Sequence, residues 1–331
     1  MRLRRLLRLR HAAGRGRLCA RVRRRPCLRG RRARGGAGAL IDFCGLQLEH
    51  EVINGSGTFD AIAARRAFGA ELLDRFPFSA FVSKTITLKP RAGNPPPRLW
   101  ETAGGMINSI GLPNKGLAGY LEHDLPQLAE LPVPLITNVM GSTAEELTEL
   151  AAACDERPEI AAIELNVSCP NVATGLDIGA VPAELERVVA GVRPATTKPL
   201  IVKLTPNTAD VAACGRAAEA GGADAVSLIN TLRAMALDSD GEPWLGGRTG
   251  GLSGPAIRNV AVAQVAAVAA GVTVPIVGMG GVQTGAHALD LLRAGATLVA
   301  VGTESFRDPA AGGRIARELR EKAANSANPF A

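Results

Sequence analysis

The chain has 331 residues, of which 47% are hydrophobic and 21% charged, so it can bury a large core and is not disordered throughout. Residues 1–37 hold 15 of the basic side chains and no acidic one, whereas residues 38–331 hold 23 basic and 31 acidic side chains, a net charge of −8. An acidic body argues against nucleic-acid binding. No apolar run reaches the roughly 18 residues that a membrane span needs.

Residues 1–37 are predicted to be an Arg-rich tail that carries no part of the function. A membrane anchor, a nucleic-acid-binding arm and a transit peptide are alternative interpretations, but transit peptides are rich in serine and the first serine here is Ser56. The composition is explained without assigning a function to residues 1–37 if they are a disordered basic tail or a stretch translated from an upstream start codon. The working part is then a single domain over residues 38–331.

From residue 38 onward, short apolar or β-branched runs alternate with alanine-rich helical segments. The predicted strands are Glu51–Asn54, Phe81–Thr87, Pro134–Gly141, Ile160–Ser168, Leu200–Thr205, Ala225–Asn230, Pro275–Gly280 and Leu298–Gly302. Apolar strands alternating with helices indicate a parallel sheet with crossover helices. Eight such units predict an α/β fold, the (β/α)8 TIM barrel. A doubly wound sheet is the alternative, but Gly55-Ser-Gly57 fails the GxGxxG pattern because Asp60 stands at its last position.

Polar residues recur where the predicted strands end, which is where TIM barrels place their chemistry. They are Asn54, Ser56, Lys84, Thr85, Asn138, Asn166, Asn171, Lys203, Asn230 and Thr231. Any one of them has a plain explanation as a satisfied core residue, but their common position predicts a ligand site. Gly280, Gly281, Gly302 and Thr303 follow the last two strands, where bare backbone N–H groups can hold a phosphate, although glycine pairs also make tight turns.

Cys169 is the candidate for proton transfer. It lies in a short segment before Pro170, whereas Cys154 and Cys214 fall within helical patterns. A thiol, with an ordinary pKa of about 8.5, acts as a general base once its surroundings favour the thiolate. The cysteines form no Cys-x-x-Cys pair and the histidines lack metal-ligand spacing, so no metal site is expected and the thiols indicate a cytoplasmic protein.

Eight segments of the chain resemble the dihydroorotate dehydrogenases. The segments are Lys84–Arg91, Gly93–Arg98, Gly105–Leu112, Glu164–Asn171, Val202–Asn207, Ile229–Thr231, Thr249–Pro255 and Ile276–Gly281. They follow one another in register between about residue 40 and about residue 306. The resemblance implies a TIM barrel that binds FMN at the C-terminal face of its strands. It also implies oxidation of dihydroorotate to orotate in pyrimidine (UMP) biosynthesis.

The resemblance further implies roles for individual residues. Cys169 would take the proton from C5 of dihydroorotate while a hydride leaves C6 for N5 of the flavin. FMN would be bound by Ser56, Lys84, Thr85, Asn138, Asn166, Lys203, Ile229, Gly254, Gly280, Gly281, Gly302 and Thr303. The substrate would be bound by Lys84, Asn108, Ser109, Ile110, Gly111, Leu112, Asn166, Asn230 and Thr231.

The electron acceptor is inferred from a few loop residues. A cysteine base resembles the soluble class, since the membrane-bound class has serine there. Residues 170–179 and the loop Gly93–Arg98 resemble the NAD-linked type. That type implies a partner subunit carrying FAD and a [2Fe–2S] cluster, around a homodimer core within a heterotetramer, with no nucleic-acid or membrane partner. The alternatives are a fumarate-linked enzyme and another FMN barrel that acts on a related pyrimidine.

Overall fold

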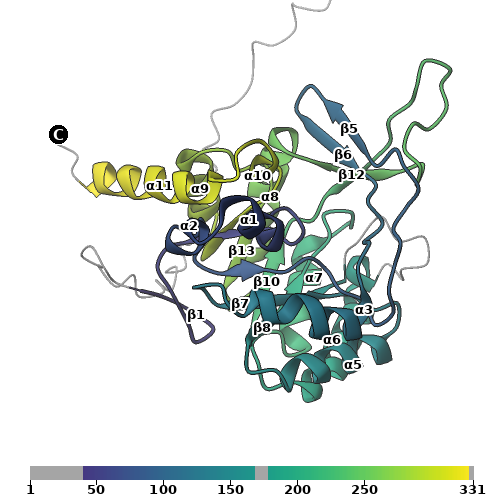
Figure 1. Ribbon diagram of the computed structural model, residues 1–331, viewed down its shortest axis with the longest axis horizontal. Helices are drawn as coiled ribbons and strands as arrows, with labels where there is room; N and C mark the ends of the chain where they lie inside the picture. Colours follow the sequence, from purple (N-terminus) through teal and green to yellow (C-terminus); the bar gives the residue numbers. More distant parts are fainter. Residues whose placement is uncertain (1–39, 168–177, 328–331) are drawn as a thin grey trace, which may run out of the picture. The chain divides into compact units, whose positions relative to one another are not determined.

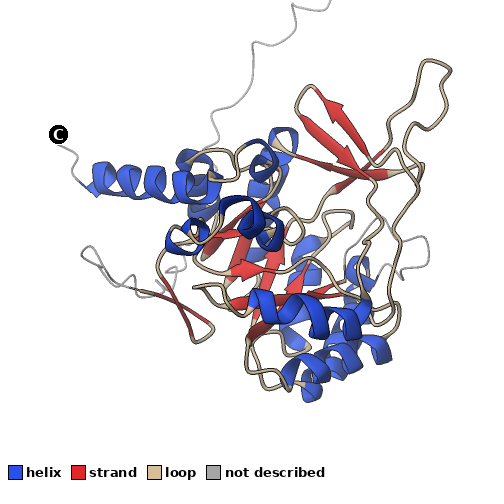
Figure 2. Cartoon of the chain, in the orientation of Figure 1, coloured by secondary structure: helices blue, strands red, loops and turns tan. Residues whose placement is uncertain are grey.

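The computed structural model describes residues 40–167 and 178–327. All eight predicted strands are present in one parallel sheet. Its order is β3 (Val52–Asn54), β14 (Leu298–Val301), β13 (Ile276–Met279), β10 (Ala225–Leu228), β9 (Leu200–Lys203), β8 (Ile160–Asn166), β7 (Leu135–Val139) and β4 (Phe81–Val82). Chain order runs around this sheet, which curls into a barrel inside a layer of helices (Figures 1 and 2). The predicted TIM barrel is confirmed.

The helices cover the outside of the barrel. They are α1 (Ala61–Phe68), α2 (Glu71–Asp74), α3 (Gly116–Gly119), α4 (Leu125–Leu128), α5 (Ala144–Asp155), α6 (Pro182–Val192), α7 (Val211–Ala220), α8 (Arg258–Ala269), α9 (Gly285–Arg293), α10 (Glu304–Arg307) and α11 (Ala311–Ala327), with a π-helical turn over Tyr120–Asp124. Short 3-10 turns add Ile178–Ala180, Arg193–Ala195 and Pro255–Ile257. Within the described residues, no helix is both long and apolar enough to cross a bilayer.

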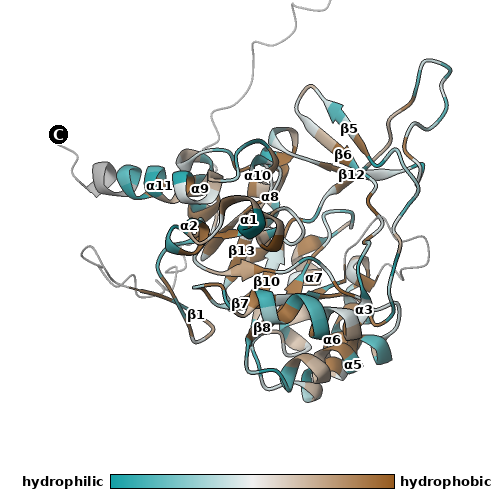
Figure 3. Cartoon of the chain, in the orientation of Figure 1, coloured by the Kyte–Doolittle hydropathy of each residue, from teal (hydrophilic) through white to brown (hydrophobic). Residues whose placement is uncertain are grey.

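The alternation of side chains along each strand determines what faces the barrel interior. Ile136, Ala162 and Ile201 belong to one apolar cluster with the inward residues of the other strands, whereas their neighbours pack outward against the helices. In Figure 3 brown dominates in several strands of the barrel, and teal residues are concentrated on the surrounding helices and loops. Because side chains two residues apart share a face, Asn138 and Lys203 follow Ile136 and Ile201 into the barrel interior. Because alternate side chains of a strand face the same way, the polar residues near the strand ends point into the barrel at one of its ends.

Asn54 closes the barrel between its first and second strands. Its side-chain Nδ2 donates to the carbonyl of Val82 at 2.8 Å, and its Oδ1 accepts from the N–H of Val82 at 2.8 Å. The amide thus replaces a pair of backbone hydrogen bonds between β3 and β4, which share no ladder. The sequence groups Asn54 with the ligand-binding residues at strand ends, and for this residue the structure shows a closing role in the fold.

Two structures absent from the sequence prediction flank the barrel. The hairpin of β1 (Ile41–Phe43) and β2 (Leu46–Leu48) packs on the inner apolar cluster. At the opposite end, β11 (Leu232–Ala234), β12 (Gly250–Ser253), β6 (Gly105–Asn108) and β5 (Leu99–Thr102) form an antiparallel sheet. In Figure 1, β5 and β6 stand away from the barrel. Their partners lie far apart in the chain, Asn108 opposite Gly251, so local sequence patterns did not reveal them.

Gly285, the first residue of α9, is where this helix meets α11. A Cβ on Gly285 would overlap the backbone N of Leu319 and the backbone of Glu318, neither of which can move without shifting the helix. We expect Gly285→Ala to lower the free energy of unfolding by about 1–3 kcal/mol, the usual cost of overpacking. Urea unfolding followed by circular dichroism measures it.

Gly191 in α6 provides the matched control, because a Cβ there would have no atom within 4 Å. Gly191→Ala removes a flexible glycine from a helix without a clash, and it should stabilise the protein by roughly 0.5–1 kcal/mol. Equal effects of the two substitutions would contradict the packing argument at Gly285.

Candidate active site

A chain of side-chain hydrogen bonds links four strand ends at the C-terminal end of the barrel. Ser56 Oγ lies 3.3 Å from Thr85 Oγ1. Asn166 Nδ2 donates to Thr85 Oγ1 at 3.4 Å, and Asn230 Nδ2 donates to Asn166 Oδ1 at 3.5 Å. The structure therefore brings together residues predicted from segments that are up to 174 positions apart in the chain, counted from Ser56 to Asn230. All four present polar atoms at one rim.

Lys203 and Asn138 lie deeper, inside the barrel mouth. The Lys203 side chain is only 6% exposed, yet among the described residues its ammonium has no hydrogen bond or ion pair. Asn138 is fully buried, and its Oδ1 has no hydrogen-bond partner there either. A cation on a largely buried side chain and a buried acceptor, both without partners, are costly unless a ligand meets them. These two residues indicate the floor of a binding site. Its ligand would offer an anionic or acceptor group to Lys203 and a hydrogen-bond donor to Asn138.

The glycine-rich turns after β13 and β14 bare a set of backbone donors. In the described part of the chain, the N–H groups of Gly280, Gly281, Gly302 and Thr303 find no acceptor. Gly280 and Gly281 have φ values of +133° and +69°, which favour glycine. Together with the start of α10, these turns form a cradle suited to a phosphate, as is common in TIM barrels.

Gly254 and Ile229 adjoin that cradle. A Cβ on Gly281 would come within 2.9 Å of the Gly254 carbonyl, and Thr303 Oγ1 donates to the Oγ of the neighbouring Ser253 at 2.9 Å. The buried Ile229 donates its backbone N–H to the Met279 carbonyl at 2.9 Å, at the end of β13. The structure thus gathers all the described residues predicted for FMN at one end of the barrel.

The loop predicted for the substrate runs from Asn108 to Leu112, directly after β6. Asn108 Nδ2 donates to the Gly251 carbonyl at 3.2 Å, which ties the loop to β12. Ser109 is fully buried and its Oγ donates to the Thr249 carbonyl at 2.8 Å. Asn94 donates to both Oγ and the carbonyl of Ser109, so this serine anchors the loop through its side chain. Its neighbours Ile110 and Leu112 are partly exposed, whereas Gly111 is buried.

Thr231 and Asn230 lie on the other side of β12. A Cβ on Gly251 would overlap the Thr231 side chain, and Gly251 pairs with Asn108 in the sheet. Asn207, which was not predicted as a site residue, donates from Nδ2 to the Thr231 carbonyl at 3.1 Å. Small residues on β12 therefore allow Asn108 and Thr231 to approach one another.

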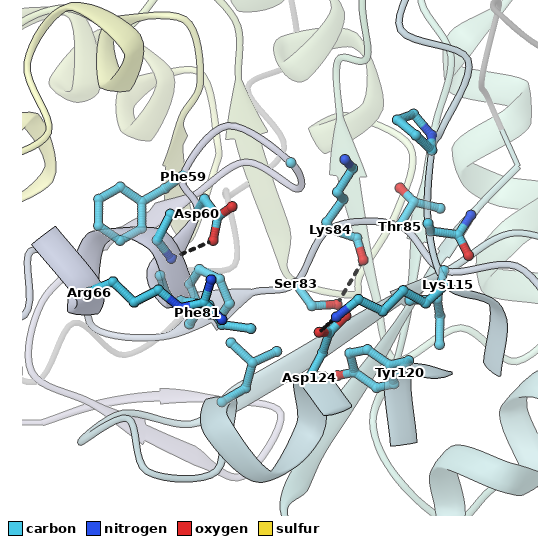
Figure 4. A pocket seen from close by; sticks show the side chains of 18 residues that line it. Phe59, Asp60, Arg66, Phe81, Ser83, Lys84, Thr85, Lys115, Tyr120 and Asp124 are labelled. Carbon is cyan, nitrogen blue, oxygen red and sulfur yellow. Dashed lines mark hydrogen bonds and ion pairs between the residues drawn. The ribbon is translucent and has the colours of Figure 1, made fainter. Parts of the chain in front are cut away.

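A cavity of about 410 Å³ opens beside Lys84, between α1 and the turn that follows α3 (Figure 4). Its apolar wall includes Phe59, Phe81 and Tyr120, and an ion pair of Lys115 with Asp124 crosses its rim. Partial burial lowers the pKa of Lys84, Asp60 and Asp124 oppose this, and Arg98 adds to it. No described residue pairs with the Lys84 ammonium, which leaves it a cation able to meet a carboxylate.

Cys169, predicted as the base, lies outside the described residues, as does Asn171. Among the described residues, no group of three or more His, Cys, Asp or Glu side chains could hold a metal ion. Two buried residues escaped the sequence prediction, Glu164 and Ser227, which bond to one another at 2.6 Å inside the barrel. The sequence did contain a sign of Glu164, because it is the single carboxylate in the otherwise mostly apolar strand Ile160–Asn166.

Comparisons with known proteins agree with this geometry. A family model described as dihydroorotate dehydrogenase matches residues 39–323. The dihydroorotate dehydrogenase B (NAD(+)) catalytic subunit of Citrifermentans bemidjiense is 46% identical over 85% of this chain and 92% of its own length. The subunits of the same name from Pelobacter propionicus and Desulforudis audaxviator are 47% and 46% identical, over 84% and 85% of the chain and 91% of each relative. The chain belongs to the dihydroorotate dehydrogenase family.

Proposed function

We propose that this chain is the catalytic subunit of a dihydroorotate dehydrogenase that oxidises dihydroorotate to orotate, with FMN at the C-terminal end of its barrel. The observation that carries the proposal is the largely buried Lys203 side chain, whose ammonium has no partner among the described residues, at the same end as the bare N–H groups of the glycine-rich turns. The similarity to named catalytic subunits over most of the chain supports the substrate.

The residues present fit FMN group by group. The N–H groups of Gly280, Gly281, Gly302 and Thr303 would hold its phosphate. Lys203 would face the electron-accepting ring, where a cation stabilises negative charge. Ser56, Thr85, Asn138, Asn166, Ile229 and Gly254 would complete the flavin site. When bound, FMN supplies an acceptor for the hydride that leaves C6 of the substrate.

The chain's own side chains would bind and deprotonate the substrate. The Lys84 ammonium would pair with the substrate carboxylate, and the amides of Asn108, Asn166 and Asn230 would bond to the pyrimidine edges, since an amide offers both donor and acceptor. Ile110, Gly111, Leu112 and Thr231 would line the remaining substrate surface, and Ser109, predicted with them, would hold their loop in place through its bonds to Thr249 and Asn94. The Cys169 thiolate would accept the C5 proton, so the substrate loses one proton and one hydride and becomes orotate.

Electrons would leave the chain through another subunit. The relatives are named NAD(+)-linked catalytic subunits, which supports NAD⁺ as the final acceptor here. The proposed partner carries FAD and a [2Fe–2S] cluster and joins a homodimer of this chain in a cytoplasmic heterotetramer. A stable lone dimer that reduces fumarate efficiently would contradict this assignment of the acceptor.

Anaerobic titration of the purified chain with dihydroorotate tests the core of the proposal. Bleaching of the flavin absorbance band near one equivalent of dihydroorotate would support cofactor, substrate and hydride transfer together. A yellow protein that dihydroorotate does not bleach would move the substrate to a related pyrimidine. A colourless protein that takes up no added FMN would refute the proposal.

The proposed single domain is tested by removing residues 1–37, the Arg-rich tail. We expect the shortened chain to keep its turnover with dihydroorotate, because every site residue proposed here lies beyond residue 50. Steady-state rates of the two forms, measured at equal flavin content, decide it. If the shortened chain lost both its turnover and an ability of the full-length chain to bind nucleic acid, residues 1–37 would have a function of their own.

A further inference from the structure

Glu164 is a buried carboxylate at the centre of β8 for which the proposed reaction has no use. It is 4% exposed and stands opposite Asn138 of β7 in the sheet. It follows the inward-facing Ala162 by two residues, so its side chain points into the barrel. A carboxylate in an apolar barrel is expensive to bury, which calls for partners on both oxygens.

Both oxygens of Glu164 accept hydrogen bonds from neutral side chains. Oε2 accepts from Asn138 Nδ2 at 2.5 Å, and Oε1 accepts from Ser227 Oγ at 2.6 Å. In the described part of the chain, no lysine or arginine forms an ion pair with it. The carboxylate is therefore held by two donors, one of which belongs to the predicted flavin site.

This contact fixes which end of the Asn138 amide faces the site. Rotation of an amide by half a turn exchanges its oxygen and its nitrogen, but a carboxylate can only accept hydrogen bonds. Glu164 therefore requires Nδ2 on its side. The Asn138 backbone is also committed, since its N–H donates to Ser83 Oγ and its carbonyl accepts from the N–H of Ile86. With Nδ2 turned toward Glu164, Oδ1 lies on the other side of the amide, buried and without a partner among the described residues.

We propose that Glu164 is a positioning residue that makes Asn138 present an acceptor, and not a donor, to the flavin ring. The inference rests on the proposed FMN site. The oxidised flavin ring has one N–H, at N3, so a ring donor for Asn138 Oδ1 is that group. Ser227 completes the arrangement by holding the second carboxylate oxygen.

The test compares FMN with 3-methyl-FMN, which lacks the N3–H, on full-length chain stripped of flavin and reconstituted. Flavin fluorescence quenching gives both dissociation constants. In Glu164→Gln the side chain at 164 can donate, so Asn138 is no longer fixed. We expect FMN affinity to fall about fivefold to tenfold, the effect of one hydrogen bond, while the affinity for 3-methyl-FMN changes by less than about twofold.

An equal loss of affinity for both flavins would mean that Glu164 has only a structural role. Unchanged affinity for both would mean that Glu164 does not affect the flavin site. Either result would overturn the proposal. Ser227→Ala keeps the carboxylate but removes the hydrogen bond that holds its Oε1 in place, so Glu164 becomes able to turn away from Asn138. This variant should act in the same direction with a smaller effect, and it serves if Glu164→Gln fails to fold. Glu318→Gln in α11 controls for the loss of a carboxylate and should change neither constant. If the wild-type chain binds no FMN, the proposed function fails instead.

Discussion

Replacing Cys169 with alanine is expected to slow reduction of the bound flavin by dihydroorotate by about 10²–10⁴-fold, the usual contribution of a positioned general base. FMN should remain bound, because the substitution leaves every residue proposed to hold it unchanged, and all of these except Asn166 lie outside β8, the strand that precedes Cys169. Anaerobic stopped-flow absorbance separates the two effects, since the flavin band reports content before mixing and reduction after it.

The pH dependence adds an independent readout for Cys169. In the wild type, the reduction rate should rise with pH as the thiol becomes the thiolate, and in Cys169→Ala this rise should disappear. Cys44→Ala is the matched control, because that thiol donates to the Asp224 carbonyl just before β10, at the opposite end of the barrel. An unchanged rate in Cys169→Ala would exclude this residue as the base.

Replacing Lys203 with methionine should also have a large effect, for an electrostatic reason. Methionine fills nearly the same space, so the substitution removes the buried charge without leaving a large cavity. The reduced flavin would lose a cation that stabilises its negative charge, and we expect flavin reduction to slow by about 10²–10³-fold, as when one preorganised donor is removed. The midpoint potential of the flavin should fall in the same variant, since its reduced form loses more stabilisation than its oxidised form.

Lys198→Met is the control for Lys203, because Lys198 lies just before the other end of β9 and donates to the carbonyl of Ile160 at 2.6 Å. It should alter stability and leave the potential unchanged. A wild-type potential in Lys203→Met would show that the ammonium does not face the flavin.

The polar strand ends illustrate how far local sequence patterns extend. Lys203 and Asn166 were predicted together because parallel strands joined by helices all point the same way, so their C-terminal ends meet at one edge. The structure places both there, Lys203 buried and Asn166 bonded to Thr85. Asn54 looked the same in the sequence but closes the barrel against Val82. The sequence alone does not show whether an asparagine at a strand end binds a ligand or joins two strands. The difference depends on whether the neighbouring strand has backbone groups that lack a hydrogen-bond partner.

Sequence alone determined the class of fold and the end of the barrel that carries the chemistry, because both follow from short-range periodicity and from the direction shared by successive strands. Tertiary structure decided what depends on distant partners. The antiparallel sheet that holds Asn108 pairs segments 143 residues apart. The orientation of the Asn138 amide depends on Glu164 of a neighbouring strand, whose other oxygen is held by Ser227 of a third strand. Such contacts arise only when the barrel closes, since no spacing along the chain specifies which donor meets which acceptor.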